Sequence, residues 1–176
     1  MEEKTLCSET VYDGKLIKVR VDTIQTEYGT ATREIVEHRP AVAVIALHNG
    51  EFILVKQYRK SVESELIEIV AGRIEEGEQP QQAVQRKLSE EIGYRAGKIT
   101  KLGTFFLSPG YCSGYIHVFL AEELFESKYQ AEDTNKITPV RFSAKTIAEI
   151  ITAGQLKDGK TLAAFTLYQA YLKTRK

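Results

Sequence analysis

Residues 72 to 94 read GRIEEGEQPQQAVQRKLSEEIGY, and this stretch decides the fold. A short apolar strand pattern, Leu66 to Val70, precedes it and ends at Ala71-Gly72, where glycine suits a tight turn. A charged loop follows the glycine. Pro80 is well placed in the first turn of a helix and Gly93 at its end. The stretch therefore predicts a strand, a loop and a helix in succession.

The predicted helix has an apolar stripe and a charged face. Apolar residues at i, i+4 and i+8 give a buried stripe about three turns long; they are Val84, Leu88 and Ile92. Lys87, Glu90 and Glu91 fall at i, i+3 and i+4, so their side chains share another face. Two acids at the C-terminal end of a helix oppose its dipole. The charged face is therefore a candidate functional site.

Carboxylates gathered on one face of a helix suit a particular chemistry. Magnesium and manganese take oxygen ligands and keep waters for a phosphate substrate, so Glu90 and Glu91 are candidate metal ligands. Arg86 can pair with Glu78 and hold the loop against the helix. Lys87 stands on the same face, where this chemistry would require another carboxylate.

The rest of the chain predicts an α+β fold. Strands are expected at residues 16–24, 32–37, 41–47, 52–57, 99–107, 115–121 and 138–142, and helices at 144–153 and 160–173. Asn49-Gly50 predicts a hairpin turn, and Ser143 a helix N-cap. Mixed order of strands and helices favours a sandwich of helices on a mixed sheet. We expect one domain over 1–176, with an N-terminal antiparallel β subdomain at 1–38 and the core at 39–176.

Composition excludes several classes of protein. Of 176 residues, 24 are Lys or Arg and 24 are Asp or Glu, so no overall field attracts nucleic acid or a membrane surface. No apolar run approaches the ~20 residues that span a bilayer, and the first residues lack a secretory signal pattern. Cys7 and Cys112 predict free thiols in a reducing cytoplasm. The three histidines stand singly and predict no metal cluster.

The 72–94 stretch resembles the Nudix box, G-x5-E-x7-R-E-U-x-E-E-x-G-U, where U is apolar or aromatic. Eight positions match: Gly72, Glu78, Arg86, Leu88, Glu90, Glu91, Gly93 and Tyr94. Lys87 departs from the pattern. The stretches Arg33-Glu34, Gln57-Tyr58-Arg59 and Ser108-Pro109-Gly110 are similar to those of ADP-ribose pyrophosphatases, in which a proline some fifteen residues past the box marks the substrate class. Pro109 stands fifteen residues after Tyr94.

The resemblance implies a fold, a reaction and a set of site residues. The fold is the Nudix α/β/α sandwich, and the reaction is Mg- or Mn-dependent hydrolysis of ADP-ribose or a similar nucleoside diphosphate sugar. The implied catalytic residues are Glu78, Arg86, Glu90 and Glu91, and the implied metal ligands are the Ala71 carbonyl, Glu90 and Glu91. The implied substrate-binding residues are Arg33, Arg59, Gly72, Pro109 and Tyr111. Relatives are commonly homodimers whose N-terminal strands help to build the partner's pocket.

Lys87 occupies the place of a metal-binding glutamate of the family. A protonated lysine cannot ligate a hard cation, and the change shifts the local charge by about two units. One hypothesis is an enzyme that binds metal weakly through Glu90 and Glu91, with Glu75 or Glu132 as a substitute ligand. The other is a nucleotide-binding or regulatory protein without turnover, in which the Lys87 ammonium mimics the metal.

Two further alternatives concern the same region. Lys87 on an exposed helix face is commonly a solvated charge, and a dimer without any ligand is the third hypothesis.

The 131–136 loop, which supplies a late catalytic glutamate in relatives, contains Glu132 and Asp133, but Thr134 or Lys136 can occupy the expected acidic position.

Overall fold

The computed structural model describes residues 3–127 and 137–175. The chain divides into two compact units, Met1–Pro40 with Phe105–Ile116, and Ala41–Thr104 with His117–Lys176. We call these the N-terminal unit and the core unit.

The core unit is built on a seven-stranded mixed sheet in the order β10-β5-β4-β9-β8, in which β6 also pairs with β5 and β7 with β4. Its strands are β4 (Ala41–His48), β5 (Glu51–Arg59), β6 (Ser64–Glu68), β7 (Val70–Arg73), β8 (Tyr94–Phe106), β9 (Tyr115–Glu126) and β10 (Thr138–Ser143). Its helices are α1 (Pro80–Ile92), α2 (Ala144–Thr152) and α3 (Gly159–Lys173), with a short 3-10 turn at Lys60–Val62.

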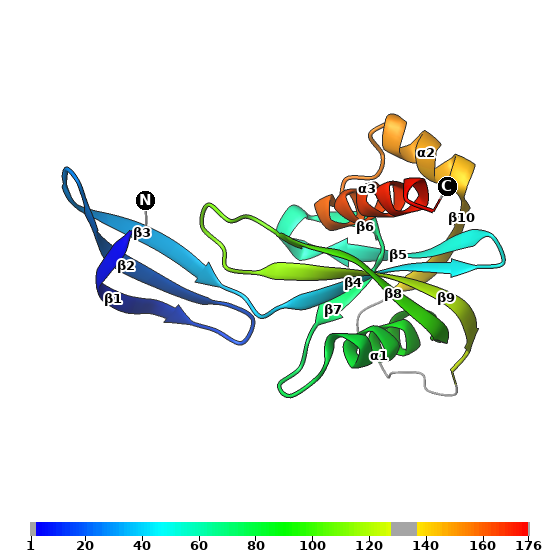
Figure 1. Ribbon diagram of the computed structural model, residues 1–176, viewed down its shortest axis with the longest axis horizontal. Coiled ribbons are helices and arrows are strands. Elements are labelled where there is room, and N and C mark those ends of the chain that lie inside the picture. Colours follow the sequence, from blue (N-terminus) through cyan, green and yellow to red (C-terminus); the bar gives the residue numbers. More distant parts are fainter. Residues whose placement is uncertain (1–2, 128–136, 176) are drawn as a thin grey trace. The chain divides into compact units, whose positions relative to one another are not determined.

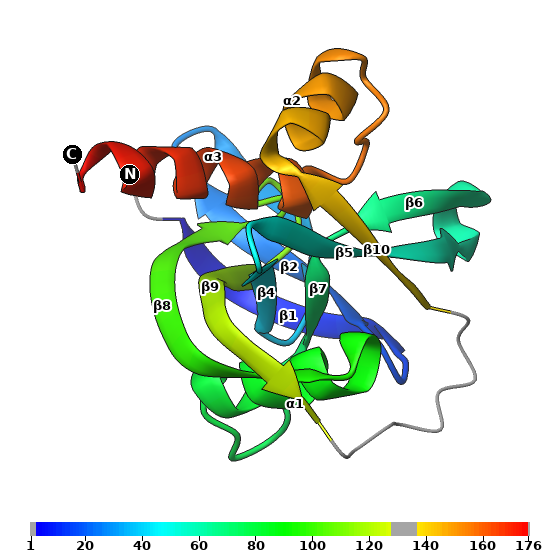
Figure 2. The same ribbon diagram turned by 90° about the vertical axis from the view of Figure 1, so that its right-hand side faces the viewer.

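Helices cover both faces of this sheet. Helix α1 lies against one face and α2 and α3 lie against the other, as the two side views show (Figures 1 and 2). The predicted stripe of Val84, Leu88 and Ile92 is buried in the core between α1 and the sheet. On the opposite face, Phe52 of β5 makes an edge-to-face contact with Phe165 of α3 at 5.2 Å between centroids. The expected α/β/α sandwich is therefore confirmed.

Several local signals in the sequence are confirmed. Asn49 and Gly50 have φ angles of 52° and 81°, the left-handed values that join β4 tightly to β5. Pro80 opens α1, and Gly93 ends it in a left-handed conformation with φ 73°. The Ser143 hydroxyl accepts a hydrogen bond from the Thr146 N–H at 3.1 Å, as expected of an N-cap.

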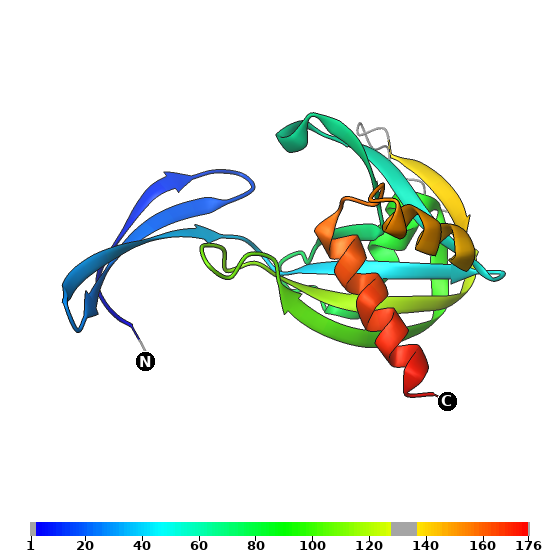
Figure 3. The same ribbon diagram turned by 90° about the horizontal axis from the view of Figure 1, so that it is seen from above.

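The N-terminal unit contains an antiparallel sheet of β1 (Lys4–Asp13), β2 (Lys18–Thr26) and β3 (Gly29–Glu37), in blue in Figure 3. The loop that follows β8 is bonded to the end of β3. The Val36 N–H donates to the Tyr111 carbonyl at 2.7 Å, and the Ser113 N–H donates to the Val36 carbonyl at 3.0 Å. This places the Ser108-Pro109-Gly110 segment in the same unit as Arg33.

The structure also differs from the sequence expectation in three places. Strand β1 was not expected; all ten of its residues are exposed, so it carries no alternation of buried and exposed positions. The expected strand 66–70 is divided between β6 and β7, which pair with β5 and β4 respectively. The sequence pattern cannot reveal such a change of partner. Asp22, a charged residue of the expected strand 16–24, is buried in β2 and pairs with Arg20 at 2.9 Å.

No helix among the described residues is long and apolar enough to cross a membrane.

Leu88→Ala tests the packing of α1 on the sheet. Leu88 is fully buried, so we expect the free energy of unfolding to fall by about 2–5 kcal/mol, from lost apolar burial and the cavity left behind. Leu172→Ala on α3 is the matched control because Leu172 is 37% exposed, and it should cost under ~0.5 kcal/mol. Urea denaturation measures both variants. Equal losses would contradict the assignment of the core.

Candidate functional site

Strand β7 and helix α1 hold the residues of the 72–94 stretch. Strand β7 is paired through Ala71 and Gly72 with Ala43 and Val42 of β4, so its backbone is fixed in the sheet. The apolar stripe of α1 packs on the sheet, which turns the charged face of the helix toward the end of β7. Local pairing and packing together bring the loop, the strand end and the helix to one place.

Arg86 closes the loop between β7 and α1. Its Nε and Nη2 donate to the two carboxylate oxygens of Glu78 at 2.8 and 2.7 Å, and Nη2 also donates to the Arg73 carbonyl at 3.0 Å. The Arg86 hydrogen bonds hold the pKa of Glu78 below its ordinary value. The Glu75 N–H donates to Glu78 at 2.9 Å. The predicted Arg86–Glu78 pair is confirmed, and both side chains are engaged in holding the loop.

Lys87 is bound to a box glutamate. Its Nζ lies 2.7 Å from Glu90 Oε2, and only 22% of the Lys87 side chain is exposed. Arg86 Nη1 lies 3.4 Å from the other oxygen of Glu90. The Glu90 carboxylate therefore accepts from two cations of its own helix. Lys87 is partly buried and paired with Glu90, so it is not the solvated charge on an exposed helix face that was one of the alternatives.

The Lys87 stem runs directly over Gly72. A Cβ atom added at Gly72 would lie 2.1 Å from Lys87 Cε and 2.5 Å from Cδ, distances that real atoms do not tolerate. Glycine at this position therefore allows the close approach of the lysine. The contact connects two positions of the box that are fifteen residues apart.

Glu91 lies deeper than Glu90, beside the end of β7. Its Oε2 accepts from the Ala71 N–H at 3.4 Å. Burial raises the pKa of the Glu91 carboxyl to about 7, although the charges of Lys87 and Arg59 and the Ala71 hydrogen bond oppose this rise. Burial thus disfavours the charged form of this carboxyl.

These carboxyls do not fit a divalent cation as they stand. Within residues 3–127 and 137–175, no group of three or more His, Cys, Asp or Glu side chains is arranged to hold a metal ion. Glu90 is neutralised by Lys87 and Arg86, and burial disfavours the charged form of Glu91. Hard cations require several charged or polar oxygen ligands. In the described part of the site, the Lys87 ammonium is paired with Glu90, and the carboxylates are not free to bind a divalent cation.

Arg59 lies at the end of β5 and is held by Glu68 at the end of β6. Its Nε and Nη2 donate to the two Glu68 oxygens at 2.7 and 2.6 Å. The Arg59 side chain is 40% exposed, whereas that of Glu68 is 1% exposed. Arg59 is also near enough to Glu91 for its charge to lower the pKa of that carboxyl. The structure thus brings Arg59 to the same site as the α1 carboxyls.

Sequence reasoning missed Glu68 and its second partner, Lys160 of α3. Lys160 Nζ donates to Glu68 Oε2 and lies 2.9 Å from Asp158 Oδ1. Burial opposes ionisation of Glu68, but the Arg59 and Lys160 contacts outweigh it and lower the pKa of Glu68. The available sequence signal was a lone acid in the apolar run LIEIV, a pattern that predicts a buried and paired charge.

The other predicted substrate residues belong to the N-terminal unit. Arg33, on β3, pairs with Glu3 at 2.5 Å. Pro109 and Tyr111 lie in the loop bonded to the end of β3, and Tyr111 is exposed. Glu132 and Asp133, together with the rest of the 131–136 loop, lie outside the described residues. Glu75 is exposed, and its backbone N–H contacts Glu78.

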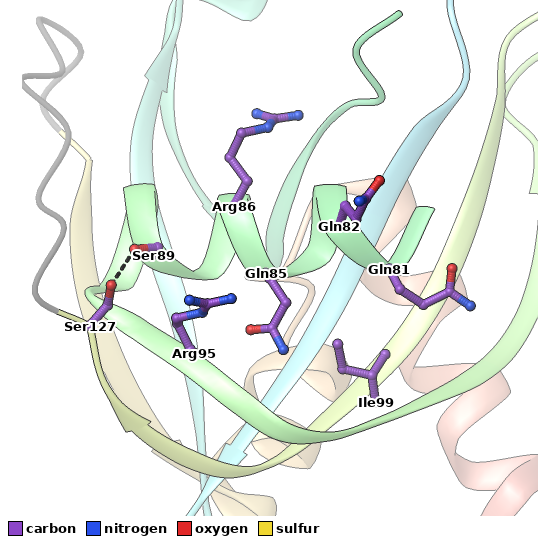
Figure 4. A pocket seen from close by; sticks show the side chains of 8 residues that line it. All are labelled: Gln81, Gln82, Gln85, Arg86, Ser89, Arg95, Ile99 and Ser127. Carbon is purple, nitrogen blue, oxygen red and sulfur yellow. Dashed lines mark hydrogen bonds between the residues drawn. The ribbon is translucent and has the colours of Figure 1, made fainter. Parts of the chain in front are cut away.

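A cavity of about 560 Å³ lies on a different side of α1. It is lined by Gln81, Gln82, Gln85, Arg86, Ser89, Arg95, Ile99 and Ser127. Figure 4 shows Arg86 projecting to the opposite side of the helix from Gln85 and Arg95. Ser89 and Ser127 are hydrogen-bonded at 2.5 Å, and Gln85 is bonded to the Ala96 backbone. The cavity shares Arg86 with the charged face that carries Lys87 and Glu90.

The sandwich fold, the clamped loop and the charged face of α1 define a protein of the Nudix class. A family model described as "NUDIX domain" matches residues 37–165. An ADP-ribose pyrophosphatase of Bacillus subtilis (strain 168) is 38% identical over 173 residues, which are 96% of this chain and 94% of the relative. The chain belongs to the NUDIX family.

Two other similar proteins extend the comparison. A methanol dehydrogenase activator of Bacillus methanolicus is 34% identical over 172 residues, covering 96% of this chain and 93% of the relative. A crystal structure of an ADP compounds hydrolase superposes with a TM-score of 0.88 over 99% of this chain and 96% of that one, at 22% identity. The structural likeness extends the shared fold to nearly the whole chain.

Glu68→Gln tests the buried charge at the site. The folded-state pKa of Glu68 lies below its ordinary value of 4.5, so the ionised carboxyl stabilises the fold above that pH, and its contribution is lost as the pH falls through the lower folded-state value. At pH 7 we expect the free energy of unfolding of the variant to be lower by about 3 kcal/mol. This is the low end for a broken buried ion pair, because Arg59 is partly exposed.

The pH dependence distinguishes this charge effect from a packing effect. The difference in Tm between Glu68→Gln and the natural protein should narrow as the pH is lowered from 7 to about 3. Thermal unfolding followed by circular dichroism measures it, with Glu51→Gln at an exposed position of β5 as the matched control. A gap that stays constant across this range would contradict the assignment.

Proposed function

We propose that this protein binds ADP-ribose or a similar nucleoside diphosphate sugar in its Nudix site and that Lys87 suppresses hydrolysis there. The contact of Lys87 Nζ with Glu90 Oε2 at 2.7 Å carries the proposal. The ammonium supplies positive charge at the position where the family pattern has a metal-binding glutamate. It also occupies a carboxylate oxygen that a divalent cation would otherwise use.

Positive groups for a diphosphate remain at the site. Lys87 and Arg59 are both close enough to lower the pKa of Glu91, so two cations lie around one buried carboxyl. A guanidinium and an ammonium are suited to phosphate oxygens, the first as a planar fork and the second as a point charge. Binding of the diphosphate through these groups requires no metal. Gly72 leaves room for the Lys87 stem to cross β7.

The retained carboxyls define what hydrolysis would require. Glu78, Arg86, Glu90 and Glu91 correspond to the catalytic pattern of the family, with the Ala71 carbonyl, Glu90 and Glu91 as the metal ligands in that pattern. In this chain Glu78 and Arg86 form the loop clamp, and Glu90 is paired with Lys87. These residues therefore support binding and loop geometry more directly than turnover.

A regulatory role is the second candidate function. The Bacillus methanolicus relative, 34% identical over most of both chains, is described as an activator of methanol dehydrogenase. A protein similar to this chain over most of its length is thus described as the regulator of another enzyme. In this regulatory role, the bound nucleotide is the signal, and Lys87 prevents its hydrolysis.

We extend the proposal to a cytoplasmic homodimer. Strand β1 is a long, fully exposed edge strand that carries Leu6, Val11 and Tyr12, and such edges favour pairing with another chain. Both Cys7 and Cys112 are free, which agrees with a reducing compartment. In the homodimer, Arg33, Pro109 and Tyr111 of the N-terminal unit would contribute to substrate binding.

Lys87→Glu tests the suppression of hydrolysis. With ADP-ribose and magnesium or manganese, we expect the natural protein to release little AMP and the variant to gain about 100-fold or more, the scale of one electrostatic catalytic group. Lys101→Glu, the same charge change at an exposed position of β8, is the control and should gain nothing. Turnover of the natural protein at ordinary enzyme rates, about 1–10³ s⁻¹, would overturn the proposal.

Lys87→Met tests the binding role of the ammonium in the same experiment series. Calorimetric titration with ADP-ribose in the presence of EDTA should give measurable binding to the natural protein. The variant should bind about tenfold or more weakly, because a charge-assisted contact to phosphate is removed. Equal affinities would show that Lys87 does not contact the ligand.

The double variant Leu6→Glu/Tyr12→Glu tests the proposed dimer. Light scattering coupled to size-exclusion chromatography should give twice the chain mass for the natural protein and a single chain mass for the variant, because like charges would be brought together at the edge of β1. Leu172→Glu, at an exposed apolar position of α3, is the control. A monomeric natural protein would rule out the dimer.

A further inference from the structure

The Arg59 guanidinium is held by a buried carboxylate that it shares with another cation. Glu68 receives Arg59 Nε on Oε1 and Arg59 Nη2 on Oε2, and Lys160 Nζ also donates to Oε2. Glu68 is 1% exposed and the Lys160 side chain is 14% exposed. One anion thus lies between two cations at the junction of β5, β6 and α3.

Lys160 is itself fixed by the first turn of α3. Asp158 is the N-cap of this helix, and its Oδ2 accepts from the Thr161 N–H at 3.0 Å and from the Thr161 hydroxyl. Asp158 Oδ1 lies 2.9 Å from Lys160 Nζ. The Thr161 Oγ1 in turn accepts from the Ile69 N–H at 3.0 Å, between β6 and β7. The helix start is therefore tied to the strand end that precedes Ala71.

Within residues 3–127 and 137–175, the fork to Glu68 occupies only one edge of Arg59. A guanidinium has five N–H donors in a fixed plane, and the fork to Glu68 uses one at Nε and one at Nη2. The Nη1 group lies outside this fork, and the side chain is 40% exposed. Because Glu68 holds the other edge, the direction of Nη1 is set by the position of Glu68.

Charge balance gives Lys160 a specific role. Without Lys160, the remaining charges of Arg59, Glu68 and Asp158 would sum to −1, which disfavours an external anion. With Lys160 and Asp158 both present, the four charged groups sum to zero and Arg59 keeps more of its attraction for an external anion. The same contacts restrain Glu68 and so restrain the guanidinium.

We propose that Lys160 is a positioning residue for ligand binding, which acts through Glu68 to hold Arg59 as the anchor for the diphosphate of the ligand. The inference rests on the proposed function, because it assumes that Arg59 binds that diphosphate. Lys160 itself has no contact with the ligand. The alternative is that Lys160 only fastens α3 to the sheet.

Calorimetric titration of ADP-ribose in EDTA compares Lys160→Met with Lys157→Met. We expect Lys160→Met to bind about tenfold more weakly, the scale of one charge-assisted hydrogen bond. Lys157→Met is the matched control, since Lys157 is exposed, lies three residues away, and belongs to the same connection before α3; its affinity should stay within twofold. Lys160→Arg retains the cation and should recover most of the affinity. An unchanged affinity in Lys160→Met overturns the proposal.

A double-mutant cycle separates positioning from fastening. If Lys160 acts through Arg59, the Lys160→Met change should weaken binding about tenfold in the natural background and less than twofold in an Arg59→Met background. Equal losses in both backgrounds would mean that Lys160 does not act through Arg59 and would overturn the proposal. Thermal unfolding of each variant shows that it is folded, and Lys160→Gln replaces Lys160→Met if the latter does not fold.

A measurement without ligand keeps this proposal distinct from the proposed function. Hydrogen exchange at Arg59 Nε, followed by 15N NMR, reports how firmly Glu68 holds the guanidinium. Exchange should become at least about tenfold faster in Lys160→Met and stay unchanged in Lys157→Met. Absence of ADP-ribose binding to the natural protein would refute the proposed function, whereas unchanged exchange in Lys160→Met would refute the positioning role.

Discussion

The bidentate pair between Arg86 and Glu78 is the interaction on which the site depends. It closes the loop between β7 and α1, and a third hydrogen bond from Arg86 to the Arg73 carbonyl holds the strand end. Pairing of β7 with β4 fixes Gly72, and packing of α1 on the sheet fixes the charged helix face above it. Lys87 then has room to cross the glycine and reach Glu90. The clamp ties the loop that joins these two elements.

Two ionic networks act on Glu91, and both oppose the effect of burial on its pKa. Burial favours the neutral form of Glu91, whereas Lys87 on one side and Arg59 on the other favour the charged form. Each cation is in turn held by its own carboxylate, Glu90 or Glu68. The site is thus rich in fixed positive groups and poor in free carboxylates. Among the described residues, this balance is the basis for proposing an anionic ligand.

Family membership and activity are separate matters for this chain. The match to the NUDIX domain and the 38% identity to an ADP-ribose pyrophosphatase establish the family. A fold can carry several activities, and the site decides among them. Here a single position of the box, Lys87, changes the charge of the site, while the clamp, the helix packing and the glycine stay as the pattern expects. The proposed loss of hydrolysis therefore depends on one side chain.

The sequence alone determined the strand–loop–helix, the apolar stripe of α1, the Arg86–Glu78 pair and the Lys87 departure, because each depends on local spacing. It did not reveal the split between β6 and β7, the exposed strand β1, or the sharing of Glu68 by Arg59 and Lys160. Glu68 and Lys160 are 92 residues apart in the chain. Only tertiary packing brings them together, because α3 must first lie on the sheet before its lysine can reach a carboxylate buried at a strand end.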